Sequence, residues 1–238
     1  MSDKRLAVIL AHPDDESFGM GGTLAKYASQ GVAIHVILAT RGEAGIPGVD
    51  PRTAGDIRES EARSACQALG AQGLDFVGFM DRQLTAIPDE LAVDRIVEKL
   101  QEHRPDIIIT FGPDGISGHP DHVAVSRWTT TAFDRLSGLP NGPRKLYYLA
   151  PSKATQQACG GPPEPETVGG AVAYIVIDEF RAAKASAMRQ HRSQQISSAG
   201  AFDLAMHDLA CHEVFRLAQT AKPATTALED DLFNGLQS

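Results

Sequence analysis

The tripeptide His-Pro-Asp occurs twice in the chain, in residue types that hold metal ions and move protons. The copies are HPDD at residues 12–15 and HPDH at residues 119–122. Histidine is scarce, with eight in 238 residues, so two copies are unexpected from composition. A lone copy would read as a polar turn with helix-capping carboxylates, whereas two copies at matching positions favour a metal site.

The spacing within each copy suits metal coordination. His12 and Asp15 are three residues apart, as are His119 and His122. Side chains at this spacing share one face of a helical turn. One imidazole and one carboxylate from the first copy, with one imidazole from the second, would provide three ligands. Three protein ligands with an open position describe a catalytic zinc site, whereas a structural zinc takes four.

The residues beside such a metal would supply acid–base chemistry. Asp14 is a free carboxylate that could accept a proton from water as a general base. His119 could lie across the substrate, donate to a developing oxyanion and protonate a leaving amine. Asp121 could fix the tautomer and charge of one of the histidines. The metal would lower the pKa of water toward ~7 and polarise a carbonyl group.

The elements expected around the two copies alternate between strands and helices. A continuous apolar run at residues 5–11 precedes the first copy, and a β-branched run at 106–111 precedes the second. The pattern predicts further strands at 33–40, 74–80, 146–150 and 171–177. It predicts helices at 19–30, 56–69, 89–103, 122–136, 179–192 and 208–219, with Asp89 as an N-cap.

This alternation predicts an α/β fold, namely a three-layer α/β/α sandwich around a mostly parallel, Rossmann-like sheet. Ligands of such sheets bind beyond the carboxyl ends of the strands, where both copies lie. We expect a single domain over residues 1–238. Irregular loops are expected near 42–55 and 160–170, and a frayed tail from about residue 222.

Composition excludes several classes of protein. The net charge of −8 argues against a nucleic-acid partner or an anionic membrane surface. The three cysteines are far apart and form no CxxC, which argues against a disulfide framework and a cysteine zinc cluster. No apolar run approaches a membrane span or a signal-peptide core. We therefore expect a cytoplasmic enzyme without a membrane span, and a homo-oligomer is left open.

The segments AHPDDESFGMGGTLA and GHPDHVAV resemble the PIG-L/LmbE-like N-acetylglucosaminyl de-N-acetylase family. The resemblance covers about residues 5 to 215. It implies a zinc-dependent hydrolase that removes the N-acetyl group from a small amino-sugar conjugate. Two histidines and one aspartate also suit Fe²⁺ or Co²⁺. Conjugates of N-acetylglucosamine with malate or inositol, and chitooligosaccharides, all stay open as substrates.

The resemblance also assigns residues. It implies metal ligands at His12, Asp15 and His122, a general base at Asp14, and an acid or oxyanion partner at His119 supported by Asp121. It places Glu43 of RGEAG, Arg58 of RESEARSACQALG and Asp81 of GFMDR near the substrate. A stretch of the form K-x6-H-x-S-Q has no assigned role and comprises Lys184, His191, Ser193 and Gln194.

One departure from the family pattern keeps the substrate open. Some members that act on sugar conjugates carry Tyr where this chain has Ser117, so oxyanion stabilisation would fall more on the metal and His119. Two alternatives are an amidase acting on another acylated amine or thiol conjugate, and a non-catalytic metal-binding module. A nucleotide-binding oxidoreductase is disfavoured, because HPDD would place two carboxylates where a pyrophosphate should bind.

Overall fold

The computed structural model describes residues 4–150, 172–197, 212–221 and 229–236. The strands in this part of the chain form one seven-stranded sheet with the order β3-β2-β1-β4-β5-β7-β6. The strands are β1 (Arg5–Leu10), β2 (Ala33–Thr40), β3 (Gly73–Phe79), β4 (Ile107–Phe111), β5 (Lys145–Leu149), β6 (Val172–Val176) and β7 (His212–Thr220).

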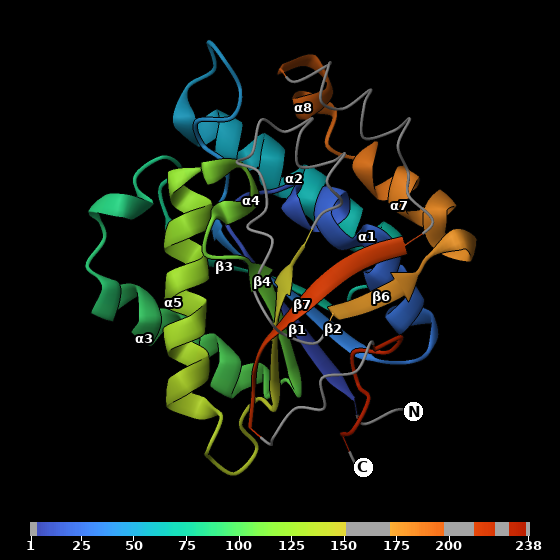
Figure 1. Cartoon of the computed structure of the whole chain (residues 1–238). Coiled ribbons are helices and arrows are strands. Elements are labelled where there is room, and N and C mark those ends of the chain that lie inside the picture. The colour runs from blue at the N-terminus through green and yellow to red at the C-terminus, as the bar shows by residue number, and fades with distance from the viewer. Residues whose placement is uncertain (1–3, 151–171, 198–211, 222–228, 237–238) are drawn as a thin grey trace.

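Helices cover both faces of the sheet, as Figure 1 shows. Helices α1, α2 and α7 pack against one another, and α3 packs against α5. The α-helices are α1 (Asp15–Ser29), α2 (Pro51–Leu69), α3 (Asp89–His103), α4 (Gly115–Gly118), α5 (Pro120–Leu136), α7 (Arg181–Met188) and α8 (Arg192–Ser197). Short 3-10 turns lie at η1 (Leu84–Ala86) and η2 (Asp178–Phe180). The predicted three-layer α/β/α sandwich is therefore confirmed.

The central strands are apolar throughout because both of their faces are covered. Every residue of β4 is buried, and in β1 only Arg5 is exposed. Strands β1 to β5 pair in parallel, whereas β7 runs antiparallel to both β5 and β6. Strand β1 lies between β2 and β4, so the chain order reverses there. Such a reversal opens a crevice at the carboxyl ends of the two strands.

Both HPD copies lie at this crevice. The first follows β1 and leads into α1, and the second follows β4 and α4 and leads into α5. Helix α5 begins at Pro120, where the missing N–H of proline costs no hydrogen bond, and His119 is its N-cap. The fold therefore brings together two segments that are more than 100 residues apart.

Helix α1 contains a kink that distant residues stabilise. Met20 leaves helical geometry with φ −149°. The backbone N–H groups of Gly22 and Thr23 then donate to the carboxylate of Glu213 on β7, at 3.1 and 2.7 Å. Lys184 of α7 donates to the same carboxylate at 2.6 Å. The C-terminal part of the chain thus fastens the helix that follows the first HPD copy.

The helix predicted over residues 208–219 is wrong for the part that the structure describes. Residues 212–220 form strand β7. Burial alternates along it, with Glu213, Phe215 and Leu217 inward. That period of two is the pattern of a strand covered on one face. The pairing of β7 with β5 and β6 determines its conformation, and its local sequence does not exclude a helix.

Two expected boundaries also change. The irregular stretch at 42–55 ends at Asp50, because α2 starts at Pro51 with the Asp50 carboxylate accepting from Thr53 N at 3.1 Å. Asp89 is the first residue of α3 and not its N-cap, which is Pro88. The Asp89 side chain instead accepts hydrogen bonds from Arg127 and Trp128. The loop expected at 160–170 lies outside the described residues.

The segment 229–236 is packed, whereas a frayed tail was expected from residue 222. Leu232 and Phe233 are buried in the core. Glu229 pairs with Lys145 at 2.9 Å, and Asp231 accepts from the Tyr27 hydroxyl at 2.8 Å. Residues 222–228 lie outside the described part. Among the described helices, none is long and apolar enough to cross a bilayer.

Because the segment 229–236 packs on the core, substitutions of its buried residues should destabilise the protein. Replacing Leu232, which is fully buried, with alanine should lower the free energy of unfolding by ~2–5 kcal/mol, because a cavity replaces its side chain. Asn234→Ala, at an exposed position, is the matched control. Urea denaturation measures both variants. Equal stability of the two would mean that the segment does not pack in solution.

Candidate metal and catalytic site

The imidazole of His12 lies buried between carboxylates at the carboxyl end of β1. Its Nε2 lies 3.1 Å from Asp81 Oδ1 and 3.3 Å from Asp121 Oδ2. Asp121 also accepts backbone N–H bonds from Arg82 and Leu84, at 2.7 and 3.3 Å. Because carboxylates only accept, Nε2 carries a proton, and the lone pair of the neutral ring is on Nδ1.

The second histidine of the site is oriented in the same manner. His122 Nδ1 lies 3.2 Å from the carbonyl oxygen of Gly115, which can only accept, so its lone pair is on Nε2. That Nε2 lies 3.3 Å from His12 Nδ1 and 3.5 Å from Asp15 Oδ1. The His122 ring stacks on Phe111 with centroids 4.0 Å apart. With both rings neutral, two imidazole lone pairs and one carboxylate therefore face each other.

This donor set fits a divalent metal ion. The ligand atoms of His12, Asp15 and His122 all lie within 4.8 Å of one another. Each imidazole donates its other N–H to an oxygen, the outer contact that metal-binding histidines make. Two nitrogens and one carboxylate oxygen leave a further position open, as catalytic zinc sites do. The structure thus brings together the three residues predicted as ligands.

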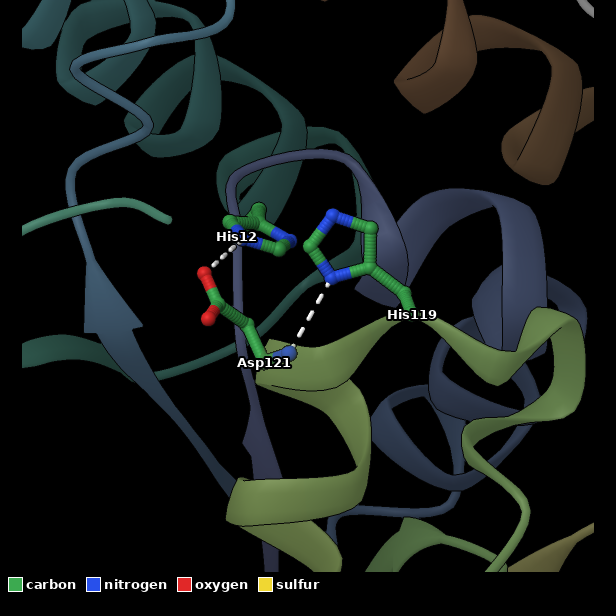
Figure 2. Close-up of side chains that lie close together, drawn as sticks. All are labelled: His12, His119 and Asp121. Atoms are coloured by element: carbon green, nitrogen blue, oxygen red, sulfur yellow. Dashed lines mark hydrogen bonds and ion pairs between the residues drawn. The ribbon is translucent and has the colours of Figure 1, made fainter. Parts of the chain in front are cut away.

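A second group shares His12 and contains His119 and Asp121. Figure 2 shows that the Asp121 carboxylate points to His12, whereas His119 contacts the backbone of Asp121. The Asp121 carboxylate already accepts two backbone N–H bonds, so it is placed to orient His12. Support for His119 comes from the N–H of Asp121, at 3.2 Å, and not from its carboxylate.

The tautomer of His119 follows from that contact. Its Nδ1 accepts the N–H of Asp121, so the proton of the neutral ring is on Nε2. Burial, followed by the nearby charges of His12 and His122, lowers the pKa of His119. The neutral ring therefore offers an N–H donor on the side away from the α5 backbone.

Asp14 occupies a strained position between the two ligands of the first copy. Its φ is 116°, a value that non-glycine residues rarely adopt at a cost of ~1–3 kcal/mol. Arg58 of α2 donates to Asp14 Oδ2 at 3.2 Å and to the backbone carbonyl of Pro13. Burial raises the pKa of Asp14 to about 6, and the charge of Arg58 opposes this shift.

Glu43, Arg58 and Asp81, the three residues expected near the substrate, form one network beside the site. Arg58 is buried and also contacts Gly42 O at 3.3 Å, and it lies 3.9 Å from Asp81. Asp81 accepts from Ala44 N at 3.0 Å, while its own N–H donates to Glu43 at 3.2 Å. Each of the three side chains thus has a partner inside the protein, although Arg58 Nε has none among the described residues. Direct contact with a substrate stays a prediction for Glu43, Arg58 and Asp81.

Close packing on Arg58 explains two glycines of the loop after β2. A Cβ atom at Gly42 or Gly45 would collide with the Arg58 guanidinium, and Gly42 has φ +73°. The segment RGEAG therefore needs its glycines because the arginine crosses it. Gln194 of α8 donates to the carbonyl of Gly45 at 3.3 Å, which connects this loop to the C-terminal part.

A third histidine and carboxylate group lies elsewhere, on His35, Asp75 and His103. The rings of His35 and His103 are stacked, with centroids 3.9 Å apart and an interplanar angle of 21°. Nitrogen lone pairs lie in the planes of their rings, so those of two stacked rings do not converge on one ion between them. Asp75 is also paired with Lys99 at 3.1 Å. The arrangement is that of a structural cluster.

Sequence reasoning missed one buried pair beside the site. Glu16 had no functional role assigned from the sequence, and neither had the stretch that contains His191. In the structure both are fully buried, with His191 Nε2 2.7 Å from Glu16 Oε1. The separation of 175 residues gives no local signal for this contact. The histidine inside the K-x6-H-x-S-Q stretch was the available hint.

The fold and the His/Asp centre define an α/β enzyme-like protein with its site at a topological switch point. Residues 7–133, more than half of the chain, match the PIG-L family, described as GlcNAc-PI de-N-acetylase. The chain belongs to this family.

Two curated relatives show what the resemblance covers. A 1D-myo-inositol 2-acetamido-2-deoxy-alpha-D-glucopyranoside deacetylase from Saccharopolyspora erythraea is 32% identical, over 80% of this chain and 77% of the relative. A deacetylase of the same name from Mycobacteroides abscessus is 29% identical, over 100% of both chains. The chain therefore spans most or all of these enzymes.

Solved structures show that the fold serves more than one activity. A deacetylase of the teicoplanin biosynthesis pathway has a TM-score of 0.69 at 21% identity, covering 90% of this chain and 97% of that one. The 4-carboxy-2-hydroxymuconate hydratase GalB from Pseudomonas putida has a TM-score of 0.67 at 19% identity, covering 93% and 98%. At these identities the likeness shows the fold alone.

The protonation of His12 predicts how pH acts on metal binding. Burial lowers its pKa, but Asp121, Asp81 and Asp15 more than offset this and raise it to about 10 in the metal-free protein. A metal at Nδ1 must displace that proton, so affinity should rise with pH until about 10. Calorimetric titration of zinc at pH 7, in buffers of different ionisation enthalpy, should show release of about one proton per ion.

Asp81→Asn and Asp121→Asn are the matched variants for this measurement. Each removes one carboxylate from His12 Nε2 and should therefore reduce the number of protons released at pH 7. Wild-type binding without proton release would contradict the assignment of His12 as a charged residue of the metal-free site.

Proposed function

We propose that the chain works as one deacetylase domain, a zinc-dependent hydrolase that removes the acetyl group from an N-acetylglucosamine-type conjugate. His12, Asp15 and His122 would hold the metal. The observation that carries the proposal is the convergence of their three donor groups next to Asp14, whose carboxylate pairs with Arg58 and lies outside the donor set. The names of the curated relatives support the class of substrate.

Each protein group has a distinct task in this reaction. A divalent ion bound to the three ligands would supply a Lewis acid that polarises the acetamide carbonyl and lowers the pKa of water. Asp14 accepts the proton of the attacking water. Its pKa, raised to about 6, lets it both take and return a proton near neutral pH. Asp14 then delivers that proton to the leaving amine.

His119 acts as the donor to the oxyanion in this scheme. Its neutral form carries the proton on Nε2, because Nδ1 accepts from the backbone of Asp121. A lowered pKa keeps the ring neutral at pH 7, so it donates a hydrogen bond without losing its proton. Any cation held by His12 and His122 would lower the pKa of His119 further. Of the two roles expected for His119, this favours the oxyanion partner over the general acid.

The deciding experiment is release of primary amine from a panel of acetamides. The panel holds N-acetylglucosamine, its conjugates with inositol and malate, N,N'-diacetylchitobiose and an acetylated amine without a sugar. Zinc-loaded protein is compared with a chelated control, and reloading with Fe²⁺ or Co²⁺ tests the choice of metal. We expect metal-dependent release from a sugar conjugate. Confirmed metal binding with no release would instead favour another amide, a hydration reaction or a non-catalytic role.

Asp14→Asn separates the base from the metal ligands. The variant should bind one metal ion like the wild type but lose ~10²- to 10⁴-fold in kcat, the usual contribution of a general base. Metal content and steady-state kinetics measure the two effects. Asp178→Asn, at an exposed position, is the control for the same chemical change. Full activity of Asp14→Asn would remove Asp14 from the mechanism.

His119→Ala tests the oxyanion role. It should lower kcat by ~10²- to 10³-fold, as loss of one oxyanion donor does. Any alkaline limb of the wild-type pH profile should persist in the variant, because His119 acts in its neutral form and does not change protonation in the scheme. Disappearance of that limb would instead identify His119 as the general acid.

A further inference from the structure

The backbone of Asp14 is strained, so contacts with other residues must hold it in this conformation. The Asp14 N–H donates to Glu16 Oε2 at 3.1 Å, and its carbonyl accepts from the N–H groups of Ser17 and Phe18 at 3.0 Å. Its φ of 116° lies well outside the regions that aspartate prefers. The Glu16 carboxylate is thus the side chain that binds the amide of the strained residue directly.

The Glu16 carboxylate is held in turn by His191, which lies between α7 and α8. Its Oε1 accepts from the Ser17 hydroxyl at 2.7 Å and faces His191 Nε2 at 2.7 Å. Glu16, Ser17 and His191 are each 0% exposed. Burial disfavours both charged forms, whereas the contact between the two side chains lowers the pKa of Glu16 and raises that of His191.

A fully buried contact between a histidine and a carboxylate adds little net stability, because the lost hydration of the two polar groups offsets their attraction. His191 Nδ1 also lacks a hydrogen-bond partner among the described residues, which adds to the unfavourable side. The pair therefore fits a geometric role better than a role in holding the fold together. The neighbouring contacts of Lys184 and Ser193 already attach this segment to β7 and α2.

We propose that His191 is a positioning residue for Asp14, acting through the Glu16 carboxylate. His191 holds Oε1 of Glu16, which directs Oε2 to the Asp14 N–H and maintains the positive φ that aims the Asp14 side chain. The inference rests on the proposed function, because it gives a purpose to the placement of the general base. It assigns a role to the histidine of the K-x6-H-x-S-Q stretch.

The test compares replacements of His191 that keep or remove the donor. His191→Leu removes it and should lower kcat roughly 100-fold, the scale of a ~1 Å misplacement, with KM changed less than about threefold. His191→Gln retains an N–H at the position of Nε2 and should restore kcat to within about threefold of wild type. Ser193→Ala removes a contact from the same segment, to Glu61, and should leave kcat unchanged.

Two further measurements keep the test decisive. If His191→Leu fails to fold because Glu16 is left charged, Glu16→Gln is added to remove that charge, and kcat should stay low. Crystal structures should show Asp14 leaving positive φ in the leucine variant and keeping it in the glutamine variant. An unchanged Asp14 φ, wild-type kcat in the leucine variant, or equal losses in both variants would overturn the proposal.

Failure of the proposed function would look different. In that case the wild type itself releases no amine from any acetamide, whatever its metal content. The crystal structures of the two His191 variants then still decide whether His191 positions Asp14, because Asp14 φ does not depend on the reaction.

Discussion

The imidazole of His12 joins the two halves of the site, and the other groups are arranged around it. One of its nitrogens faces two carboxylates that arrive on different elements, Asp81 after β3 and Asp121 on α5. Its other nitrogen faces Asp15 and His122. Because both carboxylates compete for one N–H, the ring is held from outside in a single orientation. The nitrogen of His12 that faces Asp15 and His122 therefore points in a defined direction within the crevice between β1 and β4.

Negative charge dominates the surroundings of that ring. Carboxylates come from the strand ends, from α1 and from α5, and comprise Asp14, Asp15, Glu16, Glu43, Asp81 and Asp121. Among the described residues, Arg58 contacts Asp14 and Asp81, and His191 contacts Glu16. Removing so many carboxylates from water is unfavourable unless positive charge compensates. A protonated His12 supplies part of that charge, and a divalent ion would supply more.

The sequence carried enough information to predict the parallel strands of the sheet and the convergence of His12, Asp15 and His122. Continuous apolar runs identified β1 and β4 because strands buried on both faces need no alternation, and the HPD copies marked their ends. Residues 212–220 were misread because their conformation depends on pairing with β5 and β6. The contacts of Arg58 and His191 were equally invisible, since each joins elements distant in the chain. Local periodicity predicts elements, whereas such contacts depend on tertiary packing.

The contact between Glu16 and His191 also bears on the order in which the protein is made. A ribosome releases every proposed metal ligand by residue 122, together with the parallel strands β1 to β4. His191, the partner of Glu16, is synthesised 175 residues after it. A domain folds as a unit, so a nascent chain that ends before His191 contains every proposed ligand but cannot form the contact that holds Glu16. The proposed placement of the base therefore depends on the C-terminal part of the chain, whereas the three proposed metal ligands come from its first 122 residues.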